Sequence, residues 1–209
     1  MPTWHLDNAE ELAAQYQYTF YKPSPALLAR IAPGDCVKLI FRFESTDSDA
    51  PAAERMWVVV DEVLAHGHFK GHLDNEPRYI SDLKYADPVT FEARHIINTQ
   101  LDDGEESLVD RYAKRCYVTR RVIDDAQLVG DLDREEPDDD EDSGWRITAN
   151  DESKDYMDDA KNLAYVSLGV VLNLDDSFID FLDEPAGSAY VRNPDTGHFE
   201  PCDDESSDV

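Results

Sequence analysis

Alternating apolar and polar residues predict β-strands in the first half of the chain. From Val37 to Phe43 every second residue is apolar, a period of two that is typical of a half-buried strand. A second run, Arg55 to Leu64, follows a polar loop and is expected to pair with the first strand as an antiparallel hairpin. The alternation returns at Phe69–Leu73 and Val89–Ala93. Residues 35–97 are therefore predicted to form an antiparallel meander.

Helical patterns precede the meander. Asn8 stands before two acidic residues and before apolar residues at helical spacing, which indicates a capped helix from Asn8 to Tyr21. The segment Pro23 to Ile31 predicts a second, shorter helix. Two helices and a meander are thus expected in the first part of the chain.

The second half of the chain mixes strand and helix patterns. The predicted elements are strands at Cys116–Val122, Trp145–Thr148 and Leu163–Leu174, a helix from the capping residues 150–153 to about Asn162, a short helix after Asp175-Asp176, and a hairpin around residues 193–197.

The predicted fold class is α+β, in two small domains. Residues 1–100 form the first, with its helices and meander, and residues 115–200 form a second, mixed domain. The polar stretch 101–114 is the predicted linker, because periodicity lapses there. Residues 201–209, mostly acid and serine, are predicted to be a disordered tail.

Net charge narrows the choice of partners. The 209 residues include 47 Asp and Glu against 19 Lys and Arg, a formal charge of -28. This charge repels nucleic acid and anionic membranes, so neither is expected as a partner, and a basic protein is the natural complement. Adaptation to a salty environment is an alternative explanation of the acidity.

No segment has the length of apolar sequence that a membrane helix needs, and the first residues lack the features of a signal peptide. A cytoplasmic protein is therefore expected. The cysteines Cys36, Cys116 and Cys202 are far apart and odd in number, which predicts reduced thiols and no disulfide or zinc framework.

Candidate metal sites are weak. His68 and His72 share one face of a predicted strand, but four residues of strand separate them by about 13 Å, too far for one zinc ion. Asp138, Asp140 and Asp142 imitate the start of a calcium loop without its later Gly and Glu. No metal or cofactor is predicted.

Catalytic motifs are also missing from the sequence, so an enzyme is not expected and no catalytic residue is assigned. One alternative is a hydrolase that uses paired carboxylates such as Glu135 and Asp142. Such pairs arise by chance in a chain this acidic.

The stretch Arg134–Ile147 sets a dense acidic run against a Gly-Trp-Arg step. A solvated loop is one interpretation, because blocks of like charge usually repel one another at the surface. The other is a structured turn whose carboxylates meet a cationic partner.

Two motifs in this stretch, Arg134-Glu135-Glu136-Pro137 and Asp142-Ser143-Gly144-Trp145-Arg146, together with Pro185–Tyr190 downstream, resemble the immunity-protein-33-like family, once catalogued as domain of unknown function 2185. The resemblance spans about residues 115 to 200. Separately, Pro33–Lys38, Glu54–Val58, Gly71–Pro77 and Asp82–Tyr85 resemble another uncharacterised bacterial domain, domain of unknown function 2314.

The first resemblance implies a bacterial immunity protein, or antitoxin, that binds and neutralises a basic toxin or effector without catalysis. The partner-binding residues carried over from the motifs are Arg134, Glu135, Glu136, Asp142, Ser143, Trp145 and Arg146. A structural role is the alternative for most of them, with Trp145 in the core and each arginine paired internally. The extra acids Asp138–Glu141 are expected to be a flexible insertion.

A competing function is a small-molecule or peptide-binding regulatory module. In that case the two motifs would line a pocket rather than a protein interface.

Overall fold

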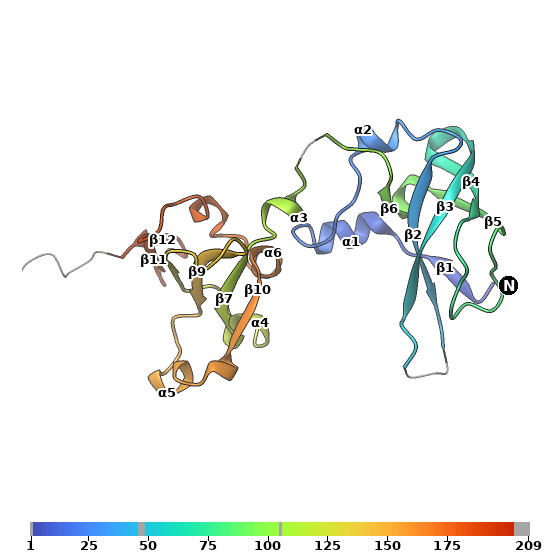
Figure 1. The fold of residues 1–209 in the computed structure, drawn as a ribbon. Coiled ribbons are helices and arrows are strands. Elements are labelled where there is room, and N and C mark those ends of the chain that lie inside the picture. The colour runs from blue at the N-terminus through green and yellow to red at the C-terminus, as the bar shows by residue number, and fades with distance from the viewer. Residues whose placement is uncertain (1, 46–48, 105, 203–209) are drawn as a thin grey trace, which may run out of the picture. The chain divides into compact units, whose positions relative to one another are not determined.

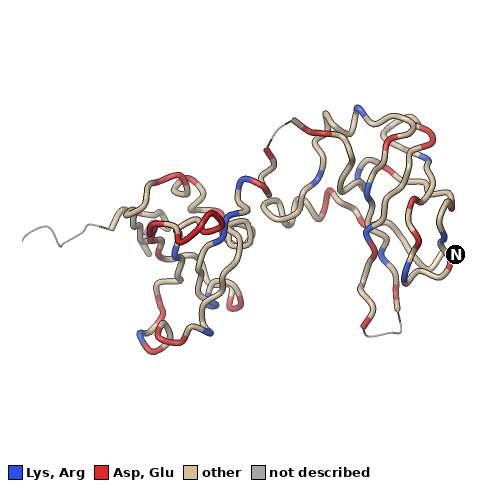
Figure 2. The backbone as a smooth tube through the Cα atoms, in the orientation of Figure 1, with Lys and Arg blue, Asp and Glu red and all other residues tan. Residues whose placement is uncertain are grey.

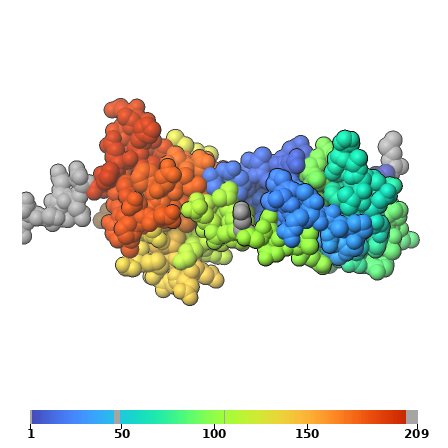
Figure 3. All heavy atoms as spheres, turned by 90° about the horizontal axis from the view of Figure 1, so that it is seen from above, coloured from blue at the N-terminus to red at the C-terminus, as the bar shows by residue number. Residues whose placement is uncertain are grey.

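The computed structural model describes residues 2–45, 49–104 and 106–202. The chain falls into two compact units, residues 1–107 and 108–209, each with helices and a sheet, as the α+β prediction requires. In the space-filling view the residues of each unit pack together, blue to green in the first and yellow-green to red in the second (Figure 3). Of the predicted tail, Pro201 ends a strand, and residues 203–209 lie outside the described part.

The first unit is built on an antiparallel sheet (Figure 1). Its strands are β1 (Trp4–Leu6), β2 (Cys36–Phe43), β3 (Ala53–Val63), β4 (His68–Leu73), β5 (Pro88–Glu92) and β6 (Ile96–Thr99). The strands β2 to β5 pair in sequence order, which confirms the meander. The sequence did not predict β1 or β6. Both pair with the edge of β2 that lies opposite β3.

The core of this unit lies on the face that the alternation predicts. Val37, Leu39 and Phe41 on β2 have no exposed surface, and Phe69 and Phe91 stack with ring centroids 5.3 Å apart. On β4 the residues between the buried ones, His68 and Lys70 among them, face solvent. The period of two was therefore sufficient to assign the buried face.

Four short helices complete the described part of the first unit. They are α1 (Ala9–Gln15), α2 (Pro25–Leu28) and the 3₁₀ turns η1 (Ala65–Gly67) and η2 (Ala93–His95). Asn8 caps α1 by accepting the N–H of Glu10, as predicted. The helix ends well before Tyr21, because the chain turns there and brings Phe20 into the small cluster around Ile40.

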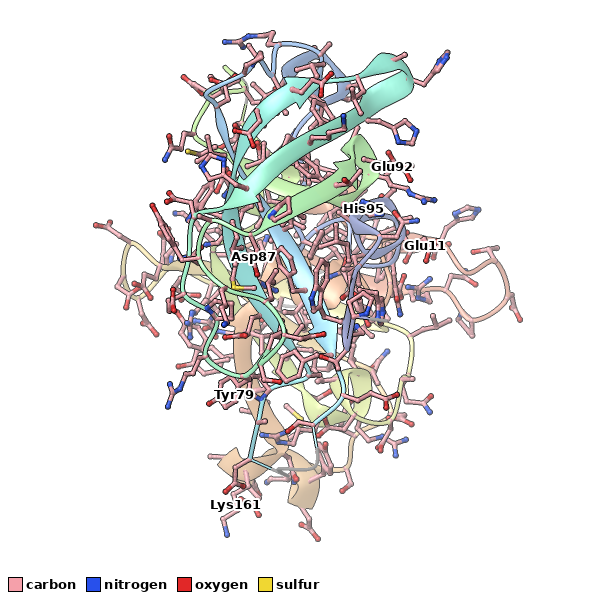
Figure 4. All side chains as sticks on the ribbon, turned by 90° about the vertical axis from the view of Figure 1, so that its right-hand side faces the viewer. Glu11, Tyr79, Asp87, Glu92, His95 and Lys161 are labelled. Carbon is pink, nitrogen blue, oxygen red and sulfur yellow. The ribbon has the colours of Figure 1, made fainter. Side chains whose placement is uncertain are left out.

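The turn η2 joins β5 to β6 and carries a reciprocal cap. The Glu92 N–H donates to Nδ1 of His95 over 3.0 Å, and the Glu92 carboxylate accepts the His95 N–H in return. Figure 4 shows these two residues together, with Glu11 of α1 nearby. Burial lowers the pKa of His95, which suits an imidazole that accepts a hydrogen bond in its neutral form.

The second unit contains a mixed sheet with the order β10-β7-β9-β8-β11-β12. Its strands are β7 (Arg115–Thr119), β8 (Asp131–Arg134), β9 (Asp142–Thr148), β10 (Leu163–Ser167), β11 (Ala189–Arg192) and β12 (Phe199–Pro201). Strands β7 and β9 are parallel and the other pairs are antiparallel. The hairpin of β11 and β12 was predicted, whereas β8 was not.

Short helices link these strands. They are α3 (Leu108–Arg111), α4 (Arg120–Ile123), α5 (Lys154–Met157), α6 (Leu168–Leu172) and the 3₁₀ turns η3 (Ala160–Asn162) and η4 (Ile179–Phe181). The helix predicted to end near Asn162 is two elements, α5 and η3. Likewise, the strand predicted for Cys116–Val122 ends at Thr119, where α4 follows.

The prediction of one strand from Leu163 to Leu174 was wrong. Only Leu163–Ser167 is a strand, and the rest of the apolar run contains α6. The N–H groups of Leu168 and Gly169 bond the carbonyls of Lys114 and Tyr112, which turns the chain out of the sheet. An apolar run this long fits a strand or a helix, and tertiary contacts decided between them.

No helix among the described residues combines the length and apolar character needed to cross a membrane.

Candidate protein-binding surface

The hairpin of β8 and β9 brings the two sequence motifs together. Arg134 lies opposite Trp145 in the pairing, and the Glu135 N–H donates to the Gly144 carbonyl over 2.9 Å. Gly144 has φ of 82°, and a Cβ there would overlap the Glu135 carbonyl oxygen, so only glycine fits. The motifs are therefore two sides of one hairpin.

The acidic run between the motifs is an ordered turn, and the prediction of a flexible insertion was wrong. The Asp139 carboxylate accepts the N–H groups of Glu141 and Asp142 at 2.8 and 2.9 Å, and Asp142 accepts the N–H of Asp138 at 3.1 Å. Carboxylates close turns in this way by bonding nearby backbone N–H groups. The remaining acids, Asp140 and Glu141, are held on the surface by this frame.

Arg146 is the cation at the centre of the hairpin. Its guanidinium donates to both carboxylate oxygens of Asp142, at 3.2 and 3.1 Å, and to Glu135 at 2.8 Å. Burial of Asp142, whose side chain is 1% exposed, opposes ionisation. The hydrogen bonds from Arg146 and from two backbone N–H groups outweigh burial and lower the Asp142 pKa to about 2. The pair is therefore ionised at neutral pH.

Arg134 and Trp145 fasten a later loop to the sheet. The indole N–H of Trp145 donates to the Leu182 carbonyl over 3.4 Å. The guanidinium of Arg134 lies 5.4 Å from the Trp145 ring and donates to the carbonyls of Leu182 and Glu184. Both side chains thus serve the packing of this unit.

Burial corrects the prediction that three of these residues contact a partner. Trp145, Asp142 and Ser143 are 0%, 1% and 3% exposed, so a partner cannot reach them in this conformation. Ser143 donates to the Arg115 carbonyl over 2.7 Å, a contact within the sheet. The structural alternative holds for these residues.

The outward face of the same sheet carries two tyrosines that the sequence analysis did not select. Tyr117 and Tyr165 lie directly opposite each other on β7 and β10, with ring centroids 4.7 Å apart. Arg146 lies 4.8 Å from the Tyr117 ring, and Arg115 lies 5.4 Å from the Tyr165 ring. These four residues are called the tyrosine–arginine cluster below.

An acidic rim borders the cluster. It consists of Glu135, which is 58% exposed, Asp138, which is 78% exposed, and the exposed acids Asp139, Asp140 and Glu141. The Arg115 N–H donates to the Glu141 carbonyl over 2.7 Å, which joins the turn to the cluster. Partial burial raises the pKa of Tyr165, and the charges of Asp139 and Asp142 raise it further. Figure 2 shows the concentration of Asp and Glu in this hairpin.

The sequence held a signal for one of the two tyrosines. Tyr117 lies between the buried residues Cys116 and Val118 of a predicted strand, so alternation would place it on an outward face. Tyr165 lies in a continuous apolar run, which gives no alternation to assign its face. Their pairing could not be predicted, because it depends on strand order. Of the predicted residues, Glu135 and Arg146 join this surface and Glu136 is exposed, whereas Arg134 contacts Trp145 and the Leu182 carbonyl.

The described part of the chain contains no group of three or more His, Cys, Asp or Glu residues that could hold a metal ion.

A comparison with known protein families finds a match for the part of the chain that contains most of this surface. Residues 116–203 match the family model described as the immunity protein Imm33 domain. The match begins inside β7 and includes both motifs, both tyrosines and Arg146, so the predicted resemblance of the C-terminal part is confirmed. No curated protein and no solved structure matches the chain. The resemblance of the first 100 residues to domain of unknown function 2314 stays a prediction.

Proposed function

We propose that this chain is an immunity protein whose Imm33-like unit binds and neutralises a basic toxin in the cytoplasm, without catalysis. The observation that carries the proposal is the tyrosine–arginine cluster with its acidic rim. All of these residues except Arg115 lie within the range that matches an immunity protein domain. The proposed contact residues are Arg115, Tyr117, Glu135, Asp138, Asp140, Glu141, Arg146 and Tyr165.

The two parts of this surface would have different roles. Tyrosine and arginine are enriched among the residues that supply most of the binding energy at protein interfaces. Tyr117 is 36% exposed and is held in place by its neighbours, so little side-chain entropy is lost when a partner covers it. The rim would attract a basic partner and raise the association rate, an effect that salt screens.

The way in which the carboxylates are held supports the proposal that the chain acts without catalysis. Glu135 and Asp142, the suggested acid–base pair, both accept hydrogen bonds from Arg146. A general acid needs a raised pKa, and the Asp142 pKa is instead about 2. The pair is suited to holding the hairpin, and not to proton transfer.

The alternative function, a regulatory module with a ligand pocket between the two motifs, has less support than the protein-binding surface. The motifs pair with each other, and buried Trp145 and Asp142 occupy the space that a ligand would need.

The test begins with the gene beside this one. Its product is expressed with and without this chain, and growth and binding are measured. We expect the chain to restore growth and to bind the neighbouring protein. A Tyr117→Ala, Tyr165→Ala double variant should bind about 10- to 100-fold more weakly and fail to protect, as expected for central interface residues.

Leu128→Ala is the matched control, because Leu128 is a 62% exposed apolar residue of the same unit and is not one of the proposed contact residues. It should protect fully. If the neighbouring protein is harmless and does not bind, or if the double variant protects as well as the wild type, the proposal is wrong.

A further inference from the structure

The first unit contains a hollow that the proposed function does not use. It has a volume of about 440 Å³, within the range of small-molecule sites of roughly 300–1,000 Å³. One wall comes from α1 and the residues after it, and the other comes from the outward face of β2 and β3. The lining includes Leu12, Tyr16, Phe20, Ile40, Arg42 and Arg55.

The floor of the hollow is apolar. Leu12 and Phe20 pack against the buried cluster of Ala9, Ile40 and Ile97. Tyr16, at the end of α1, is 40% exposed and forms part of the wall. An apolar ligand body would therefore gain by covering these side chains.

The two arginines of the hollow differ in how their charges are balanced. Arg42 donates to both carboxylate oxygens of Asp7 at 2.7 Å, and this pairing raises its pKa. Arg55, opposite Ile40 in the pairing of β3 with β2, is exposed and forms no hydrogen bond or ion pair with any described residue. In a chain with 47 acids, this cation forms no ion pair with a described acid, and Asp7, which also lines the hollow, is paired with Arg42.

The unpaired Arg55 and the paired Asp7 favour an anionic ligand over a cationic one. The Arg55 guanidinium offers a planar fork of donors that matches a carboxylate. Asp7 is already occupied by Arg42, so an amine would find no available carboxylate and would be repelled by Arg55.

We propose that this hollow binds a small organic acid, with its carboxylate on Arg55 and its apolar body against Leu12, Tyr16 and Phe20. The site belongs to the first unit alone. It is independent of the toxin-binding surface proposed above, and either can fail without the other.

The probes are octanoate, octylamine and octanol, titrated into the full chain by isothermal titration calorimetry and by NMR of labelled protein. We expect octanoate to bind at the hollow, to shift resonances of residues around Leu12 and Ile40, and to bind at least about tenfold more tightly than octanol or octylamine. The difference follows from one charge-assisted pair.

Arg55→Gln should remove this preference, since it leaves the apolar walls intact and replaces an exposed residue. Arg78→Gln is the control, because Arg78 lies in the same unit with its guanidinium over the Tyr79 ring and does not line the hollow. It should leave octanoate binding unchanged.

Octanoate binding that Arg55→Gln does not weaken would overturn the proposal. Equal binding of octanol, or no binding of octanoate at the hollow, would do the same.

Discussion

Single residues in the β8–β9 hairpin show why a motif can look functional and be structural. Trp145 has the residue type of an interface anchor, but its side chain is fully buried and its N–H is bonded to the Leu182 carbonyl. Gly144 is fixed by the close approach of the Glu135 carbonyl. These positions maintain the hairpin that holds Glu135 and the turn at the surface.

The buried Asp142–Arg146 pair should make the second unit sensitive to acid. The Asp142 pKa is lowered from 3.8 to about 2, so its contribution to stability is complete above about pH 4 and is lost as pH falls toward 2. At neutral pH this contribution is on the order of 2–3 kcal/mol. Unfolding in urea between pH 7 and pH 2.5 measures it.

Asp142→Asn should lower the free energy of unfolding of this unit by about 3 kcal/mol or more, because Arg146 is left partly buried without its main partner. The variant should also lose part of the acid dependence. Asp180→Asn, at an exposed residue, serves as the control. A variant as stable as the wild type, with the same pH profile, would contradict the role given to this pair.

At the scale of elements, the acidic residues of the turn between β8 and β9 fall into two groups, those that hold the turn and those that do not. Asp139 and Asp142 bond backbone N–H groups and hold the turn, whereas the side chains of Asp140 and Glu141 have no such role among the described contacts. Steering of a partner and folding of the turn can therefore be tested separately.

Asp140→Asn with Glu141→Gln should slow association with the toxin several-fold at low salt and leave the dissociation rate and the fold unchanged. The difference should vanish at about 0.5 M NaCl, where screening is strong. Stopped-flow mixing at several salt concentrations gives both rates. The matched control is Asp155→Asn with Asp180→Asn, two exposed acids outside the hairpin; an equal slowing there would mean that only net charge matters.

For the whole molecule, the acidity is uneven. The first unit has 9 Lys and Arg against 19 Asp and Glu, and the second has 10 against 28. The unit that matches the immunity protein domain is thus the more acidic one. General adaptation to salt would give no reason for this difference, whereas a basic partner of the second unit would.

Division into two compact units predicts that residues 108–209 fold alone. The isolated fragment should unfold cooperatively, show the emission of a buried tryptophan from Trp145, and bind the toxin with the affinity of the full chain. Urea unfolding followed by fluorescence tests the fold, and calorimetry tests the binding. An unfolded fragment, or one that binds only when residues 1–107 are attached, would contradict this prediction.

Long, regular patterns were enough to predict much of the fold. The alternation in β2 and β4 assigned strands and buried faces, because a side-chain period of two is a local property of extended backbone. Asn8 likewise marked the start of α1, because a cap bonds within two or three residues. The strands β1, β6 and β8 were missed, since three or four residues are too few to show a period and their pairing depends on distant partners.

The sequence by itself determined the excess of negative charge, the meander of the first unit and the two motifs of the hairpin. Tertiary structure decided what those motifs do, because burial of Trp145 and Asp142 depends on which elements cover them. It also decided that Tyr117 and Tyr165 meet on one face beside the acidic turn. The order of strands in a sheet is set by packing of the whole unit, and no local pattern in the chain encodes it.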